Sequence, residues 1–60
     1  MKLKELLNLL TDKIVLITTA DEYILGVGNT IIKNRADISE KIVLNYTFDE
    51  KAGNYDIKTK

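Results

Sequence analysis

The side chains best suited to acid–base or cation chemistry are two pairs of adjacent carboxylates. Asp21-Glu22 and Asp49-Glu50 each lie in a segment whose composition is typical of a turn. Such a pair could serve as general acid and base, or could bind a divalent cation. Neither pair has the spacing of an EF-hand loop, and solvated carboxylates are common in turns. We therefore interpret both pairs as turn residues.

Residue types that hold metals or act as nucleophiles are largely missing. The chain has no His and no Cys, the two commonest transition-metal ligands; it also lacks a thiol nucleophile and a side chain that titrates near neutral pH. Ser39 therefore has no His to activate it. Gly26 and Gly28 lack the third glycine of a dinucleotide-binding fingerprint and the lysine of a P-loop. The sequence predicts a protein that is not an enzyme, with no catalytic, cofactor-binding or metal-binding residue.

The charge balance bears on the class of partner. Nine basic and nine acidic residues give a formal net charge of zero. Nucleic-acid-binding domains of this size normally carry a basic excess, because phosphate neutralisation drives their affinity. The balance therefore argues against nucleic acid and leaves a protein partner as the expectation.

The N-terminal leucines do not form an export or membrane segment. Lys4, Glu5 and Asn8 interrupt them, so the stretch is too polar for the apolar core of a signal peptide. No apolar run approaches the length of a membrane span. We expect a cytoplasmic protein without membrane contact.

The length of the chain limits its stability. Sixty residues form one domain, residues 1–60, near the lower limit for independent folding. Small domains often depend on disulfides, metals or self-association. Because this chain lacks the residues for the first two, self-association or a bound partner is the remaining external support.

The hydrophobic pattern predicts one helix and two hairpins. Residues 2–10 have the apolar spacing of an amphipathic helix, with one stripe made by Leu3, Leu6, Leu7 and Leu10. Residues 14–19 and 23–27 are β-branched and apolar, which indicates a hairpin around Ala20-Asp21 that pairs Leu16 with Leu25. Residues 42–48 and 55–59 alternate as a second hairpin, in which Phe48 pairs with Tyr55.

These elements predict an α+β fold, with one short N-terminal helix packed on an antiparallel sheet of about four strands. A small Sm-like or SH3-like barrel with a leading helix is the alternative. The segment 29–40 is either a short helix capped by Thr30 or an irregular crossover, and the pattern does not decide between them.

Two surfaces are candidates for binding. One helix can cover one face of the sheet, yet the first hairpin is apolar on both. The residues opposite Leu16 and Leu25 form either a protein contact surface or a face covered by the 29–40 segment: Val15, Ile17 and Ile24, joined by Val43. The alternative is a nucleic-acid-binding sheet that uses the Tyr/Phe/Lys cluster of the C-terminal hairpin, with phosphate contacts from Lys51, Lys58 and Lys60.

The order of segments resembles that of uncharacterised small proteins from bacteriophages and mobile elements of Gram-positive bacteria. Met1 to Leu10 follows their Met-x-Leu-Lys-Glu-Leu-Leu start. Lys13 to Gly28 follows their strand, acidic turn and second strand that ends near glycine. The 29–40 connector departs from the group, because it lacks paired leucines. The resemblance transfers no functional residue; it implies an accessory protein, such as an anti-defence factor, that acts by binding.

Overall fold

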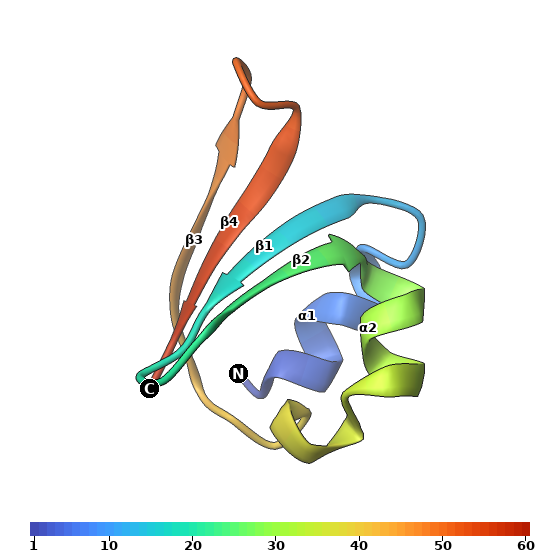
Figure 1. The fold of residues 1–60 in the computed structure, drawn as a ribbon, viewed down its shortest axis with the longest axis vertical. Helices are drawn as coiled ribbons and strands as arrows, with labels where there is room; N and C mark the ends of the chain where they lie inside the picture. Colours follow the sequence, from blue (N-terminus) through green and yellow to red (C-terminus); the bar gives the residue numbers. More distant parts are fainter.

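The computed structural model describes every residue from Met1 to Lys60 (Figure 1). Two α-helices and a short 3-10 helix lie on one side of a four-stranded sheet. In chain order the elements are α1 (Leu3–Leu9), β1 (Ile14–Thr18), β2 (Tyr23–Val27), α2 (Gly28–Asn34), η1 (Ala36–Ile38), β3 (Val43–Asp49) and β4 (Asn54–Thr59). The predicted α+β class is confirmed.

The sheet is mixed, which corrects the expectation of an antiparallel sheet. Its strand order is β2-β1-β4-β3, and the two hairpins meet through a parallel β1–β4 pair. The sheet stays open, with β2 and β3 at its edges, so the alternative of a closed barrel is also wrong. Both differences follow from the α2–η1 segment, which carries the chain from one edge of the sheet to the other, and parallel pairing needs a long crossover of this kind.

The N-terminal helix α1 confirms the predicted leucine stripe. The Lys2 backbone N–H donates a hydrogen bond to Glu5 Oε1 at 2.9 Å, which satisfies one free donor at the start of the helix. Leu3, Leu6 and Leu7 are buried against the sheet. No helix of the structure combines the length and the apolar character needed to cross a membrane.

Segment 29–40 is helical and covers the sheet. Helix α2 begins at Gly28, so Thr30 lies inside the helix and is not its cap, which corrects that expectation; no side chain caps the start of α2. At Gly28 the chain comes very close to the end of α1. A Cβ atom added to Gly28 would stand 2.2 Å from the backbone oxygen of Leu10, so only glycine fits there without a shift. The segment then turns through η1, which buries Ile38.

The second hairpin keeps the predicted pairing at one end and shifts it at the other. Phe48 pairs with Tyr55 as expected, and their rings lie 5.0 Å apart. Between Val43 and Asn45 the register shifts, so that Val43 lies opposite Thr59. An extra residue in one strand reverses the alternation beyond it. Unbroken alternation from Phe48 would put Val43 on the other side of the sheet from Phe48. The shift instead lets Val43 pack against the core, beside Val15, Ile17 and Ile24, with which the sequence grouped it.

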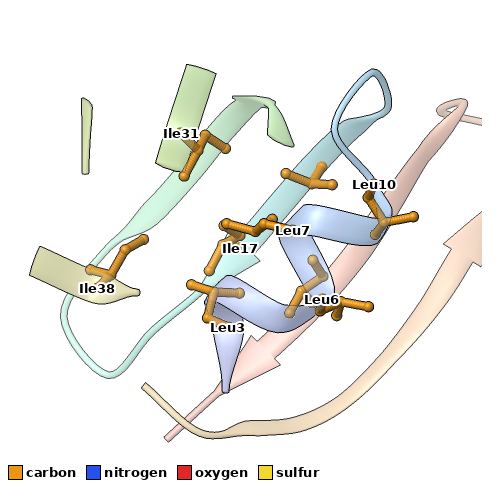
Figure 2. Close-up of a cluster of buried hydrophobic side chains, with 9 residues drawn as sticks. Leu3, Leu6, Leu7, Leu10, Ile17, Ile31 and Ile38 are labelled. Atoms are coloured by element: carbon orange, nitrogen blue, oxygen red, sulfur yellow. The ribbon is translucent and has the colours of Figure 1, made fainter. Parts of the chain in front are cut away.

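The core lies between the helices and one face of the sheet (Figure 2). Side chains of α1 project from the helix toward the strands, and Ile31 and Ile38 approach from the crossover. Nine buried apolar residues form this single cluster: Leu3, Leu6, Leu7, Leu10, Val15, Ile17, Ile31, Ile38 and Ile57. Only 12 of 60 residues are buried, so almost any core position carries a large share of the stability.

Candidate protein-binding face

The helix layer covers the residues that the sequence indicated as a contact surface. Val15 and Ile17 have no exposed area, and Ile24 and Val43 are partly buried against the core. They are not a free surface, because Ile31 and Ile38 of the crossover lie in the same cluster above them. The sequence left open whether these residues form a contact surface or a covered face. In the structure they form a face covered by the helix layer.

The opposite face of the same hairpin is uncovered. Ile14 pairs with Val27, Leu16 with Leu25 and Thr18 with Tyr23, in the register that the sequence predicted. Since paired residues point to the same side, the apolar side chains of this face form one group: Ile14, Leu16, Tyr23, Leu25 and Val27. We call this side of the sheet the open face. Tyr23 is 77% exposed and Leu25 is 69% exposed.

The open face continues from β1 onto β4 and changes character there. Leu16 pairs with Asp56, and Thr18 pairs with Lys58. Beyond β4, Asp56 pairs with Thr47 of β3. The face therefore has an apolar half on β2 and β1 and a polar half on β4 and β3.

The lysines and aromatic residues of the second hairpin do not form one platform. Tyr46 pairs with Ile57, and Phe48 pairs with Tyr55, so these aromatic side chains share the side of the sheet that carries the helices. Lys58 lies on the open face, and Lys51 lies in the turn between β3 and β4. Lys60 is exposed beyond the end of β4. Bases stacked on the aromatic rings would therefore lie on the opposite side of the sheet from Lys58.

In each pair of turn carboxylates, one side chain has a structural partner. Asp49 Oδ1 accepts hydrogen bonds from the backbone N–H groups of Lys51 and Ala52, at 3.0 and 3.2 Å, which closes the β3–β4 turn. Glu22 Oε1 lies 2.6 Å from Arg35 Nη1. No three His, Cys, Asp or Glu side chains are grouped so that they could hold a metal ion.

Two ion clusters join segments that are separate in the chain. Arg35 bridges Glu22 and Asp37, and its hydrogen bonds hold the pKa of both carboxyl groups below the usual range and raise its own pKa. Glu40 lies 2.8 Å from the ammonium groups of both Lys2 and Lys4. Hydrogen bonds from Lys2 and Lys4 lower the pKa of Glu40 to about 2, and Glu40 raises the pKa of Lys2.

Sequence reasoning missed the open face as a site because it placed α1 on the wrong side of the first hairpin. One available signal was residue size: Tyr23 and Leu25 protrude farther than the β-branched residues and glycine of the other side. Comparisons with protein-family models, with curated proteins and with solved structures find no match. The candidate function therefore depends on the geometry of the open face itself.

Proposed function

We propose that this chain is a non-catalytic protein-binding module that binds its partner through the open face. The observation that carries the proposal is the exposure of Tyr23 and Leu25 beside Ile14, Leu16 and Val27. A domain this small rarely leaves a contiguous apolar group of that kind in water, and such patches mark interaction surfaces. Burying a Val, Leu or Ile side chain contributes about 1.5 to 3 kcal/mol before association costs are subtracted.

The composition of the open face favours a protein over a nucleic acid. Its lysine, Lys58, lies on the same strand as Asp56, so the face offers phosphates little net positive charge. Tyr23 brings a large rigid side chain with a polar tip, the type of residue enriched where protein interfaces are strongest. The apolar half can exclude water from a partner while the polar half supplies hydrogen bonds at its rim.

The exposed edge of the sheet at β2 supports the same reading. Residues Tyr23 to Val27 contain no charged residue and no proline. Edge strands normally carry charges, prolines or bulges that prevent pairing with other chains. At the other edge, β3 has a register shift near Leu44, and Val43 donates a backbone hydrogen bond to Met1 at 2.9 Å. The β2 side is thus the less protected end of the sheet, which is where a partner can approach.

A role as a phage or mobile-element accessory protein, for example an anti-defence factor, belongs to this proposal. The N-terminal segment Met1 to Leu10 and the strand pattern that follows it support that context through their resemblance to such proteins. A chain of 60 residues with a small core suits action by binding, because the surface that it offers to a partner is large relative to its buried interior.

Site-specific cross-linking tests the proposal. A photo-crosslinking amino acid in place of Leu25 should give protein adducts in cells of the source organism, including adducts to the chain itself. The matched control has the same probe in place of Leu9, which is 73% exposed but lies on α1, on the other side of the sheet. Adducts from position 9 alone, or from neither position, would contradict a protein-binding open face.

A nuclease step separates the two classes of partner. Protein adducts at position 25 should survive nuclease treatment, and charge reversal of Lys51, Lys58 and Lys60 should leave the fold intact. Salt-sensitive oligonucleotide binding that the triple reversal abolishes would favour the nucleic-acid alternative, because phosphate contacts make affinity fall as salt rises.

A further inference from the structure

The register of the sheet arranges the middle of the open face in two rows that run across the strands, and the Ile14–Val27 pair lies outside them, beyond Leu16 and Leu25. One row consists of Leu25, Leu16, Asp56 and Thr47, which pair in that order from β2 to β3. The next row consists of Tyr23, Thr18, Lys58 and Asn45. Each row begins with a large apolar side chain at one edge of the sheet and ends with a small polar one at the other.

The two rows are complementary to each other. Consider a second copy related by a two-fold axis that lies between the two sheets, perpendicular to the strands and midway between the two rows. Each strand then lies opposite the same strand of the second copy and runs antiparallel to it. Leu25 then meets Tyr23 of the second copy, and Leu16 meets Thr18. Asp56 meets Lys58, and Thr47 meets Asn45. Two-fold symmetry produces every one of these contacts twice, which is the defining feature of an isologous interface.

From this complementarity we propose that the open face binds the open face of a second copy, so that two sheets pack into a sandwich. The inference rests on the proposed function, since it names the partner of the same face. Packed sheets lie about 10 Å apart, a gap that a lysine and an aspartate side chain bridge from opposite sides. The acid and the base of the face therefore find partners in the dimer, and no unpaired charge is covered.

The dimensions of the face suit a small homodimer. Four strands about 4.8 Å apart span roughly 19 Å, and five residues of strand span about 17 Å. The product is about 320 Å² of sheet plane, to which the protruding Tyr23 and Leu25 add area. The interface is therefore smaller than the roughly 600 to 1,000 Å² that each partner buries in a standard-size interface, as in weak dimers. The accessible surface of the chain is 4010 Å², so the dimer would cover an appreciable part of it. Association would also support a fold whose own core is small.

Sedimentation of the purified chain over about 1 to 500 µM, a range that covers weak and moderate affinities, tests the dimer. We expect a species of 13.6 kDa, twice the 6.8 kDa of one chain. Leu25→Lys should raise the dissociation constant at least about a hundredfold, because it places a lysine against Tyr23 of the other copy twice, in the apolar half of the interface. Leu9→Lys, an equally exposed leucine on α1, should leave the dimer intact. A parent that stays monomeric over the whole range overturns the inference.

A charge exchange tests the alignment of the rows. Lys58→Asp should weaken the dimer on the order of tenfold, since two ion pairs become repulsive. Adding Asp56→Lys to that variant should restore most of the affinity, because the exchanged charges again meet across the axis. If the double variant is as weak as the single one, the two-fold alignment is overturned. Circular dichroism of each variant verifies that the monomer is still folded.

Failure of the dimer and failure of the proposed function give different results. A monomeric parent whose position 25 still cross-links to another protein contradicts the second copy but keeps the protein-binding face. A monomeric parent without adducts at position 25 contradicts both. A dimer sensitive to Leu25→Lys supports both.

Discussion

The two faces of the β1–β2 hairpin are similarly apolar but differ in the shape of their side chains. The covered face presents short β-branched residues and a glycine: Val15, Ile17, Ile24 and Gly26. The open face presents longer residues, of which Tyr23 and Leu25 are the most exposed. Helices can approach the first surface closely, since a Cβ atom on Gly26 would already lie 3.3 Å from Ile31 Cγ1. The second surface protrudes and remains free for another molecule.

The difference shows that apolar character alone does not determine which face of a strand pair enters the core. Strands β2 and β3 lie at opposite edges of the sheet and are joined by α2 and η1. They run in the same direction, since β1 and β4 are parallel and each is antiparallel to its hairpin partner. Crossovers between parallel strands are right-handed in nearly all proteins, so strand order and direction dictate which face the helices cover.

Placing the same charge on each face is the strongest test of this contrast. Ile17→Lys should unfold the domain, because Ile17 has no exposed area and an unpaired buried ammonium costs several kcal/mol. That penalty is comparable to the whole stability of a small domain. Leu25→Lys changes the neighbouring strand on the open face and should stay folded. Thermal melting followed by circular dichroism measures both variants.

Two results would break the contrast. If Ile17→Lys melts cooperatively near the parent, the helix layer does not seal the covered face. If Leu25→Lys unfolds even at concentrations where the parent is monomeric, the open face is part of the core and no partner is needed to explain its apolar residues.

The pairing within each hairpin could be predicted from the sequence, but the arrangement of the two hairpins relative to each other could not. Leu16 opposite Leu25 and Phe48 opposite Tyr55 both follow from alternation within one hairpin, and both are confirmed. The parallel pairing of β1 with β4 joins segments about forty residues apart, for which alternation contains no information. The bulge near Leu44 changes which side of the sheet the residues before it face, and no glycine or proline near it indicates a bulge in the sequence.

The candidate site was predictable only in part. An apolar surplus on one face of the first hairpin could be counted from the sequence, and it led to the expectation of a binding surface. Its location could not be deduced, because Val15 and Leu16 are adjacent residues on opposite faces and the choice depends on strand order. Long-range ion pairs such as Arg35 with Glu22 give no local pattern either.

Adding a methyl group where α1 and α2 meet should lower the stability of the domain by less than Ile17→Lys does. Gly28→Ala would place a Cβ 2.2 Å from the backbone oxygen of Leu10, so α1 and α2 must move apart. Overpacking of this kind costs about 1 to 3 kcal/mol. Asn29→Ala, at the exposed next position of α2, is the matched control and should change stability by less than about 0.5 kcal/mol. Urea denaturation that gives equal midpoints for the two variants would mean that the helices do not meet closely at Gly28.

The smallest expected effect concerns the ion pairs between the start of α1 and Glu40. Glu40 holds Lys2 and Lys4, and their hydrogen bonds lower its pKa from 4.5 to about 2. A carboxyl group whose pKa is lower in the folded state stabilises the fold above its unfolded pKa. That contribution is lost as the pH falls from about 4.5 toward 2, so the melting temperature of the parent should decline across this window. The decline should be modest, because the three side chains are exposed and surface ion pairs contribute little.

Glu40→Gln isolates this contribution from the other carboxyl groups. The variant should melt slightly below the parent at neutral pH and lose less stability between pH 4.5 and 2, so that the two melting curves converge at low pH. Glu50→Gln, in the β3–β4 turn outside both ion clusters, serves as the matched control and should follow the parent more closely. Added salt should shrink the difference at neutral pH, because exposed charges are screened. Parallel pH profiles for the parent and Glu40→Gln would show that the lysines do not hold Glu40 in solution.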